Sequence, residues 1–181
     1  MKTTYTIDPA HSSANFSVRH LMISNVRGSF SNVTGTVVYD SENPANSSIQ
    51  AEIDADTLNT GDAQRDMHVK SQDFLHVEQH PKFQFQSTKV EPAGSGEFKV
   101  IGNLTVHGVT KPVVLTVDGP SPESKDPWGN TRIGASATTK IKRTDFGLVW
   151  NATLETGGVL LGDDLKIELD MSLVKQQAAS A

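Results

Sequence analysis

Apolar and polar residues alternate along most of this chain, and a period of two predicts β-strands rather than helices. The clearest run spans residues 165–173, where apolar side chains hold every second position and charged or hydroxyl side chains fill the positions between. Similar runs lie between turns rich in Gly, Pro, Asn and Ser. We expect strands over residues 14–20, 26–40, 49–56, 82–86, 98–106, 113–117, 131–143 and 165–173.

The run 26–40 changes phase once. Its apolar positions are Val26 and Phe30 in the first half, and Val33 and Val37 in the second, so the inward positions shift by one residue near 31–32. A β-bulge inserts one extra residue and has this effect on side-chain direction. We therefore expect a bulge or bend at that point.

About eight strands joined mostly by short turns predict an antiparallel barrel or sandwich. An eight-stranded barrel is just wide enough inside to hold one small ligand. The 181 residues suffice for one domain, and no linker divides the chain, so we expect a single domain over 1–181 with its core at about 4–174.

Residues 61–81 break the alternation with a polar stretch that holds three of the six histidines. We expect one short helix over about 61–75, seated by Met67 and Phe74 and packed beside or across the barrel. Arg65 and His68 would then lie on nearly the opposite face. They are either solvated or, if the helix crosses a barrel mouth, placed to meet a polar or anionic ligand head.

His76 and His80 are four residues apart, a spacing that places two metal ligands on one face of a helix. A zinc protease motif requires Glu directly after the first His, whereas Glu78 stands in the middle here. Pro81 also moves His80 out of helical geometry. We expect surface histidines and no bound metal.

A second long connection runs from Phe146 to Gly162 and contains Leu148 and Trp150 among other apolar residues. Apolar connections of this length often serve as lids or binding loops, and the alternative is a plug that closes one barrel end as ordinary core. His20 and Arg143 end two apolar runs, which is where a barrel rim would lie. Each is a further candidate contact for a ligand headgroup.

Composition narrows the function classes. The net charge of −5 argues against nucleic-acid binding, and the absence of cysteine excludes disulfides and thiolate chemistry. No apolar stretch is long enough for a spanning helix, and no nucleotide or other cofactor motif is present, so we expect no cofactor. The first residues lack an apolar run, which predicts a cytoplasmic protein as given, or a periplasmic one if a leader has been removed.

Eight short segments, in order along about residues 4–174, resemble the YceI family of lipocalin-like, polyisoprenoid-binding proteins. They are residues 5–13, 16–20, 26–30, 61–68, 71–74, 80–85, 102–113 and 143–147, which include YTIDPAHSS, GDAQRDMH and GNLTVHGVTKPV. The resemblance implies an all-β, eight-stranded antiparallel barrel with a helix beside it, enclosing an apolar tunnel. It further implies bacterial, non-enzymatic binding, transport or storage of a long isoprenoid of the polyprenyl diphosphate or polyprenyl quinone type, or of a similar lipid, with a homodimer as one form.

Alternation then assigns a lining to that tunnel, with Phe146, Leu148 and Trp150 closing one end. The strand residues expected to face inward are Phe16, Val18, Phe30, Phe83, Phe85, Leu104 and Leu115. Two other functions stay open. One is an enzyme acting on a lipid or small hydrophobic substrate through His20, Arg65 and His68, and the other is a filled barrel that serves only as an interaction module.

Overall fold

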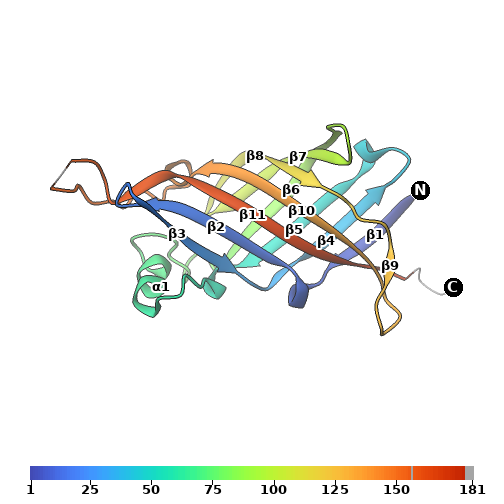
Figure 1. Ribbon diagram of the computed structural model, residues 1–181, viewed down its shortest axis with the longest axis horizontal. Helices are drawn as coiled ribbons and strands as arrows, with labels where there is room; N and C mark the ends of the chain where they lie inside the picture. The colour runs from blue at the N-terminus through green and yellow to red at the C-terminus, as the bar shows by residue number, and fades with distance from the viewer. Residues whose placement is uncertain (156, 178–181) are drawn as a thin grey trace.

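Eight antiparallel strands close into a ring in the computed structural model, which describes residues 1–155 and 157–177 (Figure 1). The ring runs from β11 through β1, β4, β5, β6, β7, β8 and β10 and back to β11, while β2 and β3 extend from β11, and β9 from β10. The strands are β1 (Lys2–Ile7), β2 (Ser13–His20), β3 (Ser24–Phe30), β4 (Val33–Asp40), β5 (Ser48–Asp54), β6 (Lys82–Pro92), β7 (Glu97–Val106), β8 (Val109–Asp118), β9 (Ser124–Lys125), β10 (Thr131–Lys142) and β11 (Leu161–Lys175). The predicted fold class, an all-β barrel of eight antiparallel strands with one short helix, is confirmed.

The ring closes where β10 pairs with β11. Every residue from Arg132 to Lys142 is in register with a residue of β11, from Val174 back to Asp164. The two strands with the longest predicted alternation, β10 and β11, therefore pair with each other where the barrel closes. Long unbroken pairing requires strands that keep one face inward along their whole length.

The strand β1 is missing from the sequence-based expectation. It is rich in threonine, and its inward residues Tyr5 and Ile7 are each only 3% exposed. β1 pairs with β4 on one side and with the end of β11 on the other. Tyr5 and Ile7 are its only two apolar or aromatic residues, too few for a clear period, although its β-branched content was a usable signal.

The predicted phase change near residues 31–32 is a break between two strands. β3 ends at Phe30 and β4 begins at Val33, with Asn32 between them at a φ of 55°. β3 pairs with β2, whereas β4 pairs with β1 and β5. The bend thus lets one continuous run serve two parts of the barrel wall.

The helix is shorter than predicted. α1 spans Ala63–Lys70, with Asp62 as its N-cap, and Phe74 lies beyond its end. Phe74 is buried as expected, but Met67 is 72% exposed, so the prediction that Met67 seats the helix is wrong. No helix within the described residues is long and apolar enough to cross a bilayer. The remaining helical turns are the 3-10 segments η1 (Pro9–His11), η2 (Pro44–Asn46), η3 (Ala55–Thr57) and η4 (Arg143–Phe146).

The two barrel ends differ in what covers them (Figure 1). One end, which we call the α1 end, carries α1, the turn between β2 and β3, and the connection that follows η4. The other, the β9 end, carries β9 and the turns that follow β4 and β6. The sequence-based headgroup candidates all lie at the α1 end, on α1, at the end of β2 or at the start of η4: His20, Arg65, His68 and Arg143.

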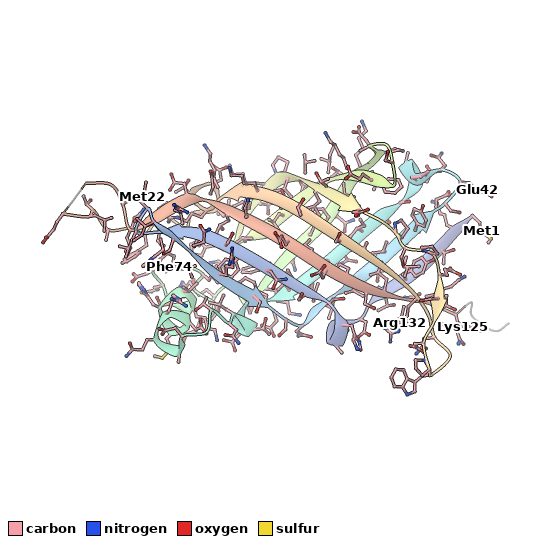
Figure 2. All side chains as sticks on the ribbon, viewed as in Figure 1. Met1, Met22, Glu42, Phe74, Lys125 and Arg132 are labelled. Atoms are coloured by element: carbon pink, nitrogen blue, oxygen red, sulfur yellow. The ribbon has the colours of Figure 1, made fainter. Side chains whose placement is uncertain are left out.

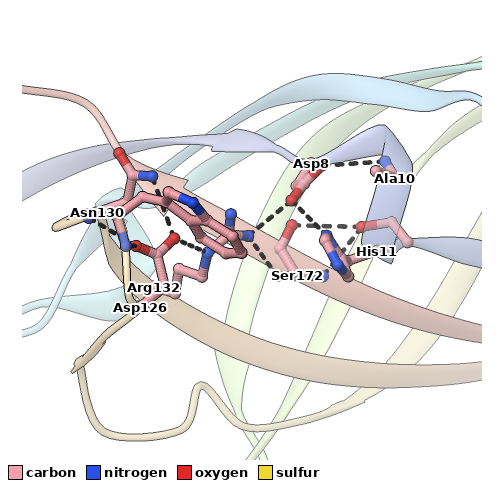
Figure 3. A network of polar contacts seen from close by, with 9 residues as sticks. Asp8, Ala10, His11, Asp126, Asn130, Arg132 and Ser172 are labelled. Atoms are coloured by element: carbon pink, nitrogen blue, oxygen red, sulfur yellow. Dashed lines mark hydrogen bonds and ion pairs between the residues drawn. The ribbon is translucent and has the colours of Figure 1, made fainter.

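An ion-pair network fastens the β9 end (Figure 3). Arg132 of β10 contacts the carboxylates of Asp8 and Asp126, each at 2.7 Å. Asp8 also accepts from the backbone N–H of Ala10 and contacts the His11 ring. Mainly through its hydrogen bond with Arg132, and then through His11, the pKa of Asp8 falls to about 2. Arg132 likewise lowers the pKa of Asp126.

We expect Asp8→Asn to lower the free energy of unfolding by about 1–2 kcal/mol at pH 7. A carboxylate whose pKa is depressed on folding stabilises the folded state above its unfolded pKa of about 3.9, and that contribution disappears as pH falls toward 2. The difference between variant and wild type should therefore shrink between pH 4 and pH 2 in urea titrations. The control is Asp170→Asn, on the exposed face of β11. A difference that stays constant over this pH range would contradict the account.

Candidate functional site

The barrel interior is hollow and forms a cavity of about 690 Å³. Its lining is almost entirely aliphatic and aromatic, and it extends from Trp150 at the α1 end to Tyr39 and Phe98 at the β9 end. Figure 2 places Phe74 beside the α1 end and Glu42 beyond the opposite end. Pockets of about 300–1,000 Å³ are typical of small-molecule and cofactor sites.

All side chains that alternation assigned to the tunnel lie on the wall of this cavity. They come from strands on every side of the ring and from the segment after β10: Phe16, Val18, Phe30, Phe83, Phe85, Leu104, Leu115, Phe146, Leu148 and Trp150. Their contact with a ligand stays a prediction. The predicted lining did not include the inward face of β11, which also lines the cavity through Leu165, Ile167, Leu169 and Met171. The period of two in residues 165–173 was the signal that could have found them.

Aromatic rings cluster in the half of the cavity nearest the α1 end. The Phe30 ring lies 5.6 Å from that of Phe16 and 5.0 Å from that of Phe83, measured between ring centroids. Gly28 lies opposite Phe16 in the β2–β3 ladder, and a Cβ atom at position 28 would stand 2.4 Å from the Phe16 ring. Glycine is therefore needed at position 28 for the Phe16 ring to lie across β3.

The segment after β10 divides into a buried part and an exposed part. Phe146 and Leu148 are 2% and 6% exposed, so this part closes the barrel as core. Trp150 then packs its ring 5.2 Å from Phe74 and 4.8 Å from His68. Residues 146–148 thus correspond to the plug alternative, whereas Trp150 forms one side of the cavity mouth.

Arg143 occupies a different environment from the exposed rim that its position suggested. It is 4% exposed, and burial lowers its pKa. Its guanidinium donates to the carbonyl oxygens of Leu148, Trp150 and Gly162, and its Nη2 lies 3.6 Å from Asp163. These contacts hold both ends of the 147–162 connection, so Arg143 positions the mouth rather than standing free for a headgroup.

Like Arg143, the other three headgroup candidates, His20, Arg65 and His68, line the cavity at the α1 end. Arg65 donates through Nε and Nη2 to the hydroxyl and carbonyl oxygens of Thr60, at 2.8 and 2.7 Å. His68 Nε2 lies 2.8 Å from a carboxylate oxygen of Asp73. The polar side of α1 therefore faces the mouth, and Met67 on its other side points into solvent. Asp62 and Gln64, which the sequence reasoning did not single out, line the same region.

His76 and His80 lie apart from the cavity wall and join His107 of the β7–β8 turn. The ring centroid of His80 lies 6.1 Å from that of His76 and 4.9 Å from that of His107. Burial, and then the neighbouring histidines, lower the pKa of His80. Within the part of the chain that the structure describes, no group of three or more His, Asp or Glu residues is arranged to hold a metal ion.

Comparisons with known proteins place this architecture in a family. The family model of the YceI-like domain matches residues 5–173. A UPF0312 protein of Vibrio cholerae is 39% identical over 146 residues, which cover 80% of this chain and 77% of the relative.

Two solved structures share the fold. Burkholderia cenocepacia BcnA superposes with a TM-score of 0.77 at 22% identity, covering 92% of this chain and 98% of that one. A polyisoprenoid-binding domain from Saccharophagus degradans, implicated in plant cell wall breakdown, gives 0.68 at 16% identity, with 96% and 99% covered. With the domain match over nearly its whole length, this chain belongs to the YceI family.

Proposed function

We propose that this protein binds a long isoprenoid lipid, or a similar amphiphile, in the barrel cavity and carries or stores it without chemical change. The single observation that carries the proposal is the apolar cavity along the barrel axis. Lining residues of β11 run from Leu161 to Leu173, which corresponds to roughly 30 Å along the axis for strands tilted by about 40°. A long, narrow apolar space suits a linear chain.

The energetics favour such a ligand. Burying hydrocarbon contributes about 0.8 kcal/mol per CH₂ group, so a chain of several isoprene units gains affinity without many polar contacts. The Saccharophagus domain, named as polyisoprenoid-binding, supports the same ligand class through its shared fold. A polyprenyl diphosphate or polyprenyl quinone would place its polar end at the α1 end, beside His20, Arg65 and His68. The compartment and a homodimer stay predictions.

The alternative, an enzyme acting on a lipid, would centre on His68, because Asp73 could orient its ring as a carboxylate orients a general base. Both side chains are about half exposed, at 41% and 50%. Among the described residues, the His68 ring contacts Asp73 and the Arg65 guanidinium donates to Thr60. The nearby Ser71 hydroxyl donates to the backbone carbonyl of His68 and not to its ring, so it is not activated as a nucleophile. The non-enzymatic function therefore has the stronger support.

Filling the cavity tests the proposal. Ala137 of β10 lines the cavity and is 7% exposed, while its neighbour Thr138 points outward. We expect Ala137→Phe to weaken binding of a C20 or longer prenol by about tenfold or more, because the added ring occupies ligand space. Thr138→Phe should bind as wild type does. The readout is Trp150 emission in a Trp128→Phe background, because Trp128 is 79% exposed and lies outside the cavity lining. Equal binding by both variants would contradict occupation of the cavity.

The headgroup end has its own test. Arg65→Gln should weaken binding of a polyprenyl diphosphate by about three- to tenfold, since it removes a charged donor from the mouth. Binding of the matching uncharged prenol should stay within about twofold. Arg27→Gln, on the exposed outer side of β3, is the control. A uniform loss for both ligands would show that Arg65 acts on barrel stability instead of on the headgroup.

A further inference from the structure

Large apolar side chains stand in solvent at the α1 end. They belong to the turn between β2 and β3 and to the connection before β11, and we call them the apolar tip: Leu21 (38% exposed), Met22 (53%), Ile23 (76%) and Val159 (38%). Figure 2 shows Met22 at this end of the barrel, beside the projecting connection before β11. Val149, at 66% exposure, belongs to the same connection.

The two loops of the apolar tip are joined. The backbone N–H of Leu21 donates to the carbonyl oxygen of Leu160 at 2.8 Å, next to Val159. Gly158 lies against Met22, because a Cβ atom at position 158 would stand 3.5 Å from Met22 Cγ. The two loops therefore lie side by side and bring these exposed side chains to one part of the surface.

The turn between β2 and β3 holds two non-glycine residues in an unfavourable backbone conformation. The N–H of Ile23 donates to the carbonyl of His20, and the two central residues, Leu21 and Met22, have φ angles of 54° and 63°. Turns of this kind favour Asn and Gly, since the left-handed region costs other residues conformational energy. Here Leu and Met occupy both positions in spite of that cost and of their exposure to water. Such a departure from turn chemistry points to a role for the side chains.

The apolar tip is continuous with the cavity mouth. His20 precedes Leu21 and lines the cavity, and Leu160 and Leu161 follow Val159 and line it as well. Trp150 forms the neighbouring side of the mouth. An apolar path thus leads from the outer surface of the tip to the interior.

We propose that the apolar tip inserts into the surface of a lipid bilayer, so that the cavity mouth faces the lipid from which its ligand enters. This inference rests on the lipid-binding function proposed above. Apolar loop residues bind the membrane interface through buried hydrocarbon area, and Arg19, whose Nη2 donates to the carbonyl of Met22, suits the headgroup level.

The surrounding charges favour a bilayer contact that is apolar rather than electrostatic. At this end Arg143 lies 3.6 Å from Asp163 and Lys140 lies 3.2 Å from Asp164, and Glu155 belongs to the same connection. Among the described residues, acidic side chains therefore accompany the basic ones near the tip. The tip also projects from two turns instead of forming a groove, and its exposed large apolar residues within the described chain are aliphatic side chains and a methionine, not the Trp or Tyr that dominate protein interfaces. Binding should therefore differ little between neutral and anionic vesicles and should persist in high salt.

The test is flotation with phosphatidylcholine vesicles. We expect the wild-type protein to float with the vesicles, and Met22→Ser combined with Ile23→Ser to lower the partition coefficient at least about tenfold. The matched control, Val114→Ser with Trp128→Ser, removes two exposed apolar side chains from other faces and should float as wild type does. Failure of the wild type to float, equal loss in both variants, or binding restricted to anionic vesicles at low salt would overturn the proposal.

A second measurement does not depend on loss of binding. The chain has no cysteine, so Ile23→Cys and Ala45→Cys can each carry a single environment-sensitive fluorophore, the first on the tip and the second in the turn after β4 at the β9 end. Vesicles should shift the emission of the probe at 23 to the blue and leave the probe at 45 unchanged. A shift at 45 alone, or at neither position, would overturn the proposal.

Two outcomes separate this proposal from the proposed function and from a protein partner. The Met22→Ser, Ile23→Ser variant should bind geranylgeraniol delivered from detergent as the wild type does, while its uptake from vesicles slows. Wild-type protein that binds the prenol from detergent but not the vesicles would overturn membrane docking alone, and the reverse would overturn the ligand alone. A concentration-dependent dimer in gel filtration that the variant abolishes would instead assign the tip to a second copy of the chain.

Discussion

The continuous pairing of β10 with β11 is the contact on which the hollow interior depends. A closed ring satisfies the backbone hydrogen bonds of its strands without an edge, so the wall keeps its shape although side chains do not fill the space inside. Small residues of β10, such as Ala135 and Ala137, face that space and leave room in it. The cavity therefore exists because the paired strands keep the barrel open and small inward side chains leave space.

The two ends of the barrel serve different purposes. At the β9 end, Arg132 joins Asp8 to Asp126 and fastens the loop before β10 to the N-terminal segment. At the α1 end, the buried Arg143 holds the connection between η4 and β11 through backbone carbonyls, and so fixes Trp150 at the mouth. Arg143 is costly to bury, and its hydrogen bonds to three carbonyl oxygens offset that cost. His20, Arg65 and His68, the polar groups proposed to meet a ligand head, lie beside the mouth at this α1 end.

Alternation along the chain predicted the wall well, because a strand's side-chain direction follows from parity alone. Every residue assigned inward on that basis, from Phe16 to Leu115, lines the cavity. Irregular segments were predicted less well. Met67 was placed on the buried side because the helix was extended to Phe74, whereas α1 ends at Lys70 and the chain changes direction. The partners of Arg143 are carbonyl oxygens of a loop, which no side-chain pattern reveals. The apolar tip was likewise hidden, since its meaning depends on which residues remain exposed.

The central claim is that a long apolar chain occupies the cavity of this YceI-family protein. The most direct measurement is organic extraction of the protein purified from cells, followed by mass spectrometry of the extract and quantification against protein. The account predicts a polyprenyl lipid, or a comparable long-chain amphiphile, at close to one molecule per barrel. An extract without such a lipid, from a protein that also fails to take up a polyprenol supplied in detergent, would contradict it.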